Sequence, residues 1–372
     1  MSDIAGQTPP RDAVVDALRV LALLPVVAIN WAGYVYLPDG GPLGPPRPAG
    51  SLAAEAVSWL LFALVAGKGL SLLAFLFGYG QALSARRHGT ASPQHRARRM
   101  RRLLGLGLLH GCLLYMGDIL TLYALSGLVM LRWSGLRLRQ LRRRLLLLLG
   151  LELLLLSVGL GVLLASGSGT APVFPGALSM PSGWLEWIRL NAGHFLATQL
   201  GFILLGLPMP LLLMTAGLMA ARLRLFTHAR WRPALRRWAQ RWQWPALALN
   251  LAWTTLQWPQ LRQGDAQALW LHFALYLLPT WLLLSAWVPR LVLGLQDGSP
   301  WLRRLAPAGR HTLSLYLLSS VLSLLLFSGA GLAWAPGTVV VTLLALGYWG
   351  GWLMVAPALG RRRLPPEAWL AR

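Results

Sequence analysis

The chain has almost no cysteine, lysine or acidic residues. Its 372 residues include one cysteine, Cys112, one lysine, Lys68, and 11 Asp and Glu against 34 Lys and Arg. A lone cysteine excludes an intramolecular disulfide and leaves the redox compartment open. Charged residues make up 12% of the chain, well below the roughly 25% of soluble domains. The sequence also lacks an ATP-binding P-loop, a heptad array and a clear internal repeat, and the missing repeat weakens the case for a transporter built from inverted halves.

Long apolar stretches fill the chain instead. Hydrophobic residues make up 56% of it, and the mean hydropathy is +0.55. Because a membrane-crossing helix needs about 20 mostly apolar residues, we predict an all-α polytopic membrane bundle of about ten transmembrane helices, with residues 1–372 as a single transmembrane domain. The predicted spans are 14–36, 52–85, 103–116, 119–133, 144–166, 195–221, 243–259, 268–290, 311–330 and 336–359.

The arginines are in register with these stretches. They gather in five clusters with two apolar spans between consecutive clusters: 86–102, 132–144, 222–241, 290–310 and 361–372. Cytoplasmic loops are enriched in Lys and Arg, so every second loop and both termini are predicted to face the cytoplasm. The net charge of +23 then reflects contact with anionic headgroups of a lipid bilayer, and no nucleic-acid partner is expected.

Two places depart from simple spans. The segment 52–85 contains Gly67-Lys68-Gly69, which predicts a helix break. Residues 52–66 then lie at the outer interface or enter the membrane only part way, and one crossing is preferred over two. The short spans 103–116 and 119–133 meet at Gly117-Asp118, so the turn between them is predicted to be sunk in the protein.

Ionisable groups inside membrane spans are costly and commonly functional. Asp16 and Arg19 share a helix face; they form either an ion pair that sets helix depth or a contact to an anionic cytosolic ligand. Asn30 either makes an interhelical hydrogen bond or lines the same cavity. Lys68 either extends to the interface or serves as a fixed cation, a base or a nucleophile inside the protein.

His110 and Asp118 flank the sunken turn in the run LLHGCLLYMGDIL. Asp118 can cap the following helix. It can also orient the ring of His110, whose ordinary pKa near neutrality suits a general base. The sequence leaves both roles of Asp118 open.

The motifs together resemble those of the YeiB-like bacterial membrane proteins, a family of unknown function. The similar segments are Asp16-Ala-Leu-Arg19 with Asn30, Gly67-Lys68 with Leu72–Gly78, His110-Gly111 with Gly117–Leu120 and Tyr123–Leu125, Gly309-Arg310 with Leu313–Leu317, and Pro366–Trp369. One departure matters for function: the family glutamate before Gly67 is Ala66 here.

In its first helix this family is similar to a wider group of transmembrane acyltransferases, which include the acyltransferase-3 enzymes and the lysosomal heparan glucosaminide N-acetyltransferase. This similarity implies transfer of an acyl group from cytosolic acyl-CoA to a small or lipid-linked acceptor at the outer side of a bacterial inner (cytoplasmic) membrane. His110 and Asp118 are the implied catalytic pair. The implied ligand-binding residues are Asp16, Arg19, Asn30, Lys68, Tyr123 and Tyr316.

Two other functions stay open. A transporter or flippase for a lipid or small metabolite would use the same intramembrane polar groups, and a non-enzymatic membrane protein fits Ala66 in place of the family glutamate. No metal is expected, and the sequence leaves the acyl group, the acceptor and the oligomeric state undetermined.

Overall fold

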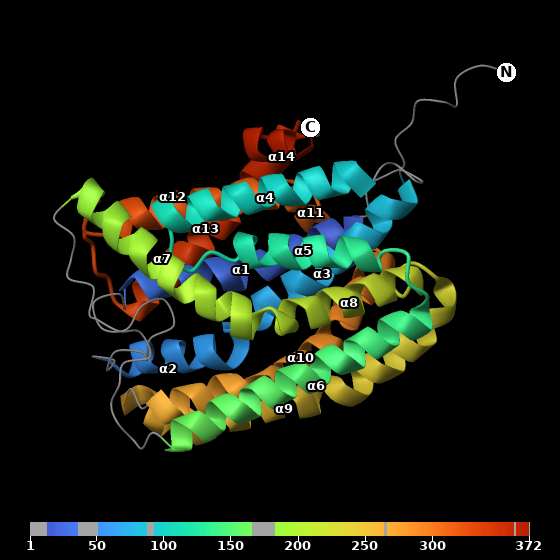
Figure 1. The fold of residues 1–372 in the computed structure, drawn as a ribbon, viewed down its shortest axis with the longest axis horizontal. Coiled ribbons are helices and arrows are strands. Elements are labelled where there is room, and N and C mark those ends of the chain that lie inside the picture. Colours follow the sequence, from blue (N-terminus) through green and yellow to red (C-terminus); the bar gives the residue numbers. More distant parts are fainter. Residues whose placement is uncertain are drawn as a thin grey trace.

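The computed structural model describes residues 13–35, 51–87, 93–165, 183–263, 266–360 and 362–371. Within these ranges every regular element is a helix and none is a strand, so the all-α prediction is confirmed. Between the predicted spans, residues 37–50 and 167–182 lie outside the described residues. The helices pack side by side along the long axis of the molecule (Figure 1).

The helices follow the apolar stretches in chain order. They are α1 (Ala13–Val35), α2 (Leu52–Leu60), the π-helix η1 (Leu61–Val65), α3 (Lys68–Arg87), α4 (Pro93–Leu113), α5 (Leu120–Trp133), α6 (Leu138–Ala165), α7 (Trp184–Gly206), α8 (Pro208–Arg222), the 3₁₀ helix η2 (Ala229–Trp231), α9 (Arg232–Gln263), α10 (Ala266–Gln296), α11 (Pro300–Leu305), the 3₁₀ helix η3 (Ala308–His311), α12 (Thr312–Phe327), α13 (Thr338–Leu359) and α14 (Pro365–Ala371).

Six segments of the described chain are long and apolar enough to cross a membrane, fewer than the ten predicted. They are Ala13–Gly33, Leu52–Ala85, Leu138–Val162, Leu275–Gln296, Ala308–Phe327 and Thr338–Leu359, and Leu120–Trp133 is a shorter apolar helix. The difference has local causes. Helices α4 and α9 begin with several turns rich in arginine, which lowers their mean hydropathy. The predicted span 195–221 is two helices, because Pro208, which lacks an N–H, begins α8.

Helix α1 lies at the centre of the bundle. It packs against α3, α12, α13 and η3, and its apolar side chains belong to both buried clusters of the protein. Helices α9 and α10 pack together along their lengths, and α6 lies against α8 and α10 on the same side of the molecule (Figure 1). The central position of α1 brings its polar residues next to the helices that carry the site.

The predicted break in the second span is present. The π-helix η1 ends at Val65, Gly67 has a φ of 70°, and α3 starts at Lys68. A positive φ is accessible to glycine because it has no Cβ. The sequence Gly67-Lys68 therefore divides the apolar segment into two helices, as predicted.

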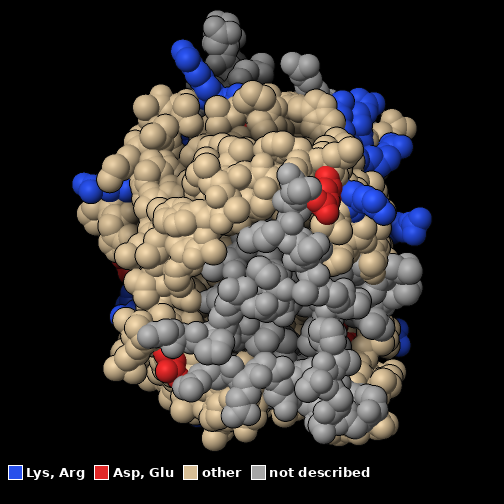
Figure 2. Space-filling model, turned by 90° about the vertical axis from the view of Figure 1, so that its left-hand side faces the viewer, with Lys and Arg blue, Asp and Glu red and all other residues tan. Residues whose placement is uncertain are grey.

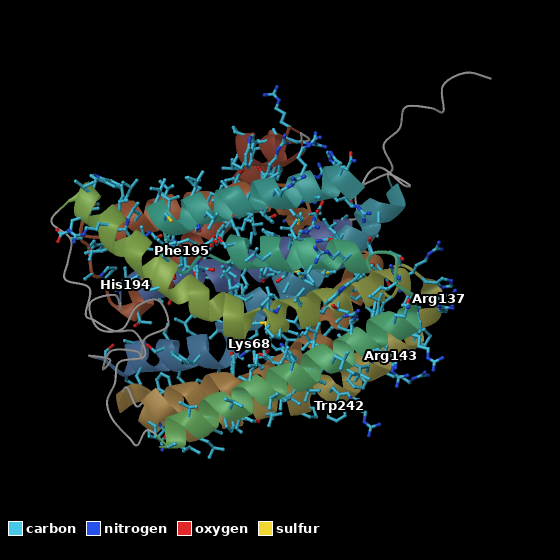
Figure 3. The ribbon with its side chains drawn as sticks, in the orientation of Figure 1. Lys68, Arg137, Arg143, His194, Phe195 and Trp242 are labelled. Atoms are coloured by element: carbon cyan, nitrogen blue, oxygen red, sulfur yellow. The ribbon has the colours of Figure 1, made fainter. Side chains whose placement is uncertain are left out.

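Charge is distributed unevenly along the bundle. Arg137 and Arg143 lie at one end, whereas His194 and Phe195 lie toward the opposite end and Lys68 lies between them (Figure 3). Figure 2 shows the end opposite to these arginines: its described surface is mostly uncharged, and most of the Lys and Arg atoms in the view lie along its margin. One end of the helical bundle is thus more basic than the other, as the arginine register leads us to expect.

Helices α3 and α8 cross with their backbones in close contact. A Cβ added to Gly78 would lie 1.9 Å from the carbonyl oxygen of Met214, and one added to Gly217 would lie 1.9 Å from that of Phe75. Small residues at such crossings let helices in membranes approach closely. The α3–α8 pair is therefore held by reciprocal glycine contacts.

Replacing Gly217 with alanine is expected to lower the melting temperature of the detergent-purified protein. The added methyl group overlaps a backbone carbonyl that cannot move alone, so the helices must separate, at a cost of about 1–3 kcal/mol. Gly150→Ala is the matched control, because nothing lies within 4 Å of a Cβ at Gly150. Equal melting temperatures for the two variants would contradict the close crossing.

Candidate functional site

The turn between α4 and α5 is buried, as predicted. His110 lies in the last turn of α4, and its carbonyl oxygen accepts hydrogen bonds from the backbone N–H groups of Leu114 and Tyr115. Tyr115 and Met116 belong to the apolar core. This arrangement turns the chain inside the protein and returns it into α5 directly beside the ring of His110.

Asp118 holds both His110 and the start of α5. Its Oδ1 lies 2.9 Å from Nδ1 of His110. Its Oδ2 accepts hydrogen bonds from the backbone N–H of Thr121 at 2.8 Å and from the Thr121 hydroxyl at 2.7 Å. The two roles that the sequence left open, helix capping and orientation of the histidine, are therefore performed by different oxygens of one carboxylate.

The other ring nitrogen of His110 contacts a serine on a distant helix. Nε2 lies 2.8 Å from Oγ of Ser320 in α12. A carboxylate accepts hydrogen bonds, so Nδ1 carries the proton toward Asp118. In the neutral ring Nε2 is then an acceptor, and the Ser320 hydroxyl donates to it. Ser320, His110 and Asp118 form one line of hydrogen bonds, which we call the Ser–His–Asp relay.

The relay is shielded from solvent. The exposed fractions are 2% for His110, 4% for Asp118 and 3% for Ser320. The ring of Tyr316 lies one helical turn before Ser320 and packs on the imidazole, with 4.9 Å between ring centroids. Sequence reasoning placed His110, Asp118 and Tyr316 in the site but missed Ser320. In the described ranges, no three His, Cys, Asp or Glu side chains are close enough to share a metal ion.

Helix α7 fixes the end of α4 that carries the histidine. Asn191 donates from Nδ2 to the carbonyl oxygens of Gly111 and Cys112, at 2.7 and 2.8 Å. A Cβ on Gly111 would lie 2.2 Å from the ring of Phe195, a residue labelled in Figure 3. Gln199 donates to the carbonyl oxygen of Asp118 at 3.3 Å. The backbone around the relay is thus positioned by three side chains of one neighbouring helix.

Lys68 and Tyr123 lie at the helix break rather than in the relay. The Lys68 ammonium donates to the carbonyl oxygen of Ala63 at 2.7 Å, forms a short contact with the Tyr276 hydroxyl, and lies 3.9 Å from the centroid of that ring. The Tyr123 hydroxyl donates to the carbonyl oxygen of Leu70 at 2.5 Å. Both side chains therefore stabilise the broken segment against α10 and α5.

Asp16 and Arg19 form the ion pair that their spacing suggests, with 3.1 Å between Nη1 and Oδ1. The side chain of Asp16 is 2% exposed and that of Arg19 is 26% exposed. A Cβ on Gly80 of α3 would lie 2.7 Å from the Arg19 guanidinium, and one on Gly309 would lie 1.8 Å from the Asp16 carbonyl oxygen. The pair lies between α3 and η3, with the cation partly accessible.

Asn30 lies next to a contact between α1 and α12. Among the described residues, its Nδ2 is buried and has no hydrogen-bond partner. The next residue, Trp31, donates from its indole N–H to the carbonyl oxygen of Ser319 at 3.0 Å. Asn30 and Ser320 are thus each one residue away in sequence from a direct contact between α1 and α12.

The C-terminal helix α14 connects the two helices that meet in the relay. Glu367 accepts hydrogen bonds from the backbone N–H of Ser314, at 2.9 Å, and from its hydroxyl, at 2.5 Å, in the first turn of α12. Arg102 of α4 donates to the carbonyl oxygen of Trp369 at 2.9 Å. A carboxylate at a helix N-terminus is favourable because it meets free N–H groups. The Pro366–Trp369 motif thus couples α4, which carries His110, to α12, which carries Ser320.

Comparison with known proteins gives two matches, both partial. The family described as "Protein of unknown function (DUF418)" matches residues 220–363. The uncharacterized protein YxaH of Bacillus subtilis (strain 168) is 33% identical over 132 residues, and the match covers 33% of this chain and 33% of that protein. The chain therefore matches about a third of the length of this relative.

The matched residues contain part of the site. They include α12 with Tyr316 and Ser320, together with the predicted motif at Gly309–Leu317, whereas His110 and Asp118 lie before them. The resemblance to the YeiB-like proteins, the DUF418 family of unknown function, is thus confirmed for residues 220–363.

Proposed function

We propose that this protein is an integral-membrane acyltransferase that moves an acyl group from acyl-CoA to a small or lipid-linked acceptor. The observation that carries the proposal is the Ser–His–Asp relay, in which the His110 ring lies 2.9 Å from a carboxylate and 2.8 Å from a hydroxyl. A carboxylate that fixes the tautomer of a histidine, and a histidine whose other nitrogen faces a hydroxyl, are elements that triads use in acyl transfer.

In this proposal His110 is the general base. Asp118 holds the Nδ1 proton and stabilises the imidazolium that forms when Nε2 takes a proton. Burial strengthens the attraction between the imidazolium and the carboxylate, because the local dielectric is low. The relay is closed in the described conformation, so turnover requires the helices around it to part and admit the donor and acceptor.

Asn30 is the residue we assign to the carbonyl oxygen of the acyl group. Its Nδ2 is buried without a partner in the described chain, and the next residue, Trp31, contacts α12 at Ser319. A preorganised donor aimed at a developing oxyanion contributes a large share of acyl-transfer catalysis. Lys68, the alternative candidate, donates to Ala63 and contacts Tyr276, so its ammonium is already engaged.

We assign the binding of the acyl donor, acyl-CoA, to the arginine-rich end of the bundle. Arg19 is partly exposed beside the buried Asp16, and guanidinium groups bind phosphate in a bidentate manner. Under the positive-inside rule this end faces the cytoplasm, where acyl-CoA is found. The protein then lies in a bacterial inner membrane with both termini inside, and its acceptor arrives from the opposite side.

Acyl-CoA is expected to raise the melting temperature of the detergent-purified protein, because a ligand that binds the native state stabilises it by mass action. The measurement uses acetyl-CoA and palmitoyl-CoA, with ATP as a control. A ligand at 100 times its Kd contributes about 2.7 kcal/mol. The shift is expected to shrink in Arg19→Ala.

The matched control for this experiment is Arg143→Ala, which removes an exposed cation from the same basic end of the molecule (Figure 3). That variant should keep the full shift. If no CoA species at millimolar concentration changes the melting temperature, acyl-CoA is not the donor. An equal loss in both arginine variants would indicate general attraction of anions instead of a site at Arg19.

One observation favours transport as a second candidate. The chain has two interrupted apolar segments, at Gly67 between η1 and α3 and at Leu207 between α7 and α8, and the helices that follow the two breaks, α3 and α8, pack against each other. Paired broken helices are a feature of secondary transporters. Counterflow of a lipid or metabolite in proteoliposomes without any acyl product would establish transport and exclude the enzyme.

A further inference from the structure

We propose that Ser320 is the nucleophile that carries the acyl group as a covalent ester between donor and acceptor. The proposal rests on the acyltransferase function given above and specifies its reaction path. Ser320 and His110 are 210 residues apart in the sequence, and their side chains meet between α12 and α4, two helices that both also contact α14.

Three other serine hydroxyls in or directly after α12 donate hydrogen bonds to the backbone of their own helix. Ser319, Ser323 and Ser328 each donate to a carbonyl oxygen three or four residues earlier, at 2.6, 3.0 and 2.7 Å. Serine hydroxyls in apolar helices commonly donate to a backbone carbonyl oxygen of the preceding turn in this way. Ser320 also has a carbonyl oxygen within reach, that of Tyr316, but at 3.4 Å.

The hydroxyl of Ser320 is instead closest to the imidazole, with 2.8 Å between Oγ and Nε2. A hydroxyl has one hydrogen, so donation to Nε2 leaves the carbonyl of Tyr316 as the weaker alternative. A base within 2.6–3.2 Å of a nucleophile, itself oriented by a third group, is the arrangement of an activated serine. Ser320 is the serine of α12 that has it.

The reaction balances with these three residues and two substrates. Oγ of Ser320 attacks the thioester carbonyl of acyl-CoA while Nε2 of His110 takes the hydroxyl proton. The C–S bond breaks, and His110 returns the proton to the CoA thiolate, which leaves as the thiol. The acceptor hydroxyl or amine then attacks the seryl ester and gives its proton to His110, which passes it to Oγ as the C–O bond to Ser320 breaks.

Burial of the relay favours a covalent intermediate. The relay is shielded from bulk water by the packed helices, so a seryl ester is protected from hydrolysis. A covalent carrier also allows CoA to leave before the acceptor binds, so the donor and the acceptor can use the same buried position one after the other. A small membrane bundle can in this way transfer an acyl group between its two faces.

A fluorophosphonate tests the nucleophile without knowledge of the acceptor, because an activated serine displaces its fluoride and keeps the phosphonyl group. The full-length protein in detergent is treated with the probe, and the labelled peptide is identified by mass spectrometry. Labelling at Ser320 is expected in the wild type and in Ser319→Ala. It is expected to be lost in Ser320→Ala and in His110→Gln. Labelling that persists in Ser320→Ala, or no labelling of the wild type, overturns the assignment.

Radiolabelled acetyl-CoA and palmitoyl-CoA then test the intermediate itself. Without acceptor, the wild type is expected to release CoA thiol in a burst of up to one equivalent and to retain the labelled acyl group on Ser320. Ser319→Ala is the matched control, since its hydroxyl bonds only to its own helix in the described structure. Ser320→Cys should retain the label as a thioester, which shows that a substitution at this position keeps the fold.

The outcomes separate this inference from the proposed function. If Ser320→Ala still transfers the acyl group and the wild type forms no ester, the acceptor attacks acyl-CoA directly; the covalent path is then wrong and the acyltransferase remains. If no CoA species binds or is cleaved, although the fluorophosphonate labels Ser320, the donor assignment is wrong and the activated serine remains.

Discussion

Replacing His110 with glutamine is expected to lower the rate of acyl transfer about 10³- to 10⁴-fold, because a general base contributes a factor of about 10² to 10⁴ and this base acts in both steps. Glutamine keeps a donor and an acceptor at the end of its side chain, so it can preserve hydrogen bonds to Asp118 and Ser320. It cannot take up a proton near neutral pH. The measurement is the initial rate of CoA thiol release with acyl-CoA in excess.

The control for this prediction is His95→Gln, which changes a histidine in the first turns of the same helix, far from the relay. That variant should release thiol at the rate of the wild type. The melting temperatures of both variants, measured in the same detergent, report whether the fold is kept. A His110→Gln protein that keeps more than a tenth of the rate would remove His110 from the chemistry and leave the relay as a structural hydrogen-bond network.

The local features of this site are readable in the sequence. His110 and Asp118 are eight residues apart, and the Gly117-Asp118 pair predicts a turn between two short apolar stretches, so their approach needs no knowledge of distant helices. The break at Gly67 is local too, because a positive φ is a property of glycine. Both predictions concern residues close together in the sequence, and both agree with the structure.

The contacts that complete the site depend on tertiary packing. Ser320 is one of several serines in an apolar helix, and the sequence gives no sign that its hydroxyl, unlike that of Ser319, leaves its own helix for a ring 210 residues away. For Lys68 the sequence leaves two interpretations, extension to the interface or a cation, base or nucleophile inside the protein. The structure adds a contact with Tyr276 of α10, 208 residues later, which neither interpretation includes. Such pairings follow from how helices pack, which hydropathy does not encode.

The division of the predicted span 195–221 has a local signal in the sequence. Leu207 keeps helical dihedral angles in the structure, but Pro208 lacks an N–H and cannot continue the hydrogen bonding of α7, so it favours the start of a new helix. Hydropathy averages over such a position and predicts one span. The same averaging predicts about ten spans where six segments of the described chain satisfy both length and hydropathy.

Replacing Asp118 with asparagine is expected to abolish the activity almost completely without unfolding the protein. The asparagine carbonyl can still accept the N–H of Thr121 and cap α5, in place of Oδ2. Its amide group then faces Nδ1 of His110 as a donor. That contact forces the proton onto Nε2, which becomes a donor toward Ser320 and can no longer accept the hydroxyl proton. In soluble triads the same reversal lowers kcat about 10⁴-fold.

The comparison with Asp118→Ala separates orientation from capping. Alanine removes the cap as well as the contact to His110, and the loss of an N-cap alone costs about 1 kcal/mol. We therefore expect Asp118→Ala to melt at a lower temperature than Asp118→Asn, while both lose acyl transfer and fluorophosphonate labelling. If Asp118→Asn kept the activity and only Asp118→Ala lost it, the carboxylate would serve α5 alone. His110 would then need no fixed tautomer, and the relay would not activate the Ser320 hydroxyl.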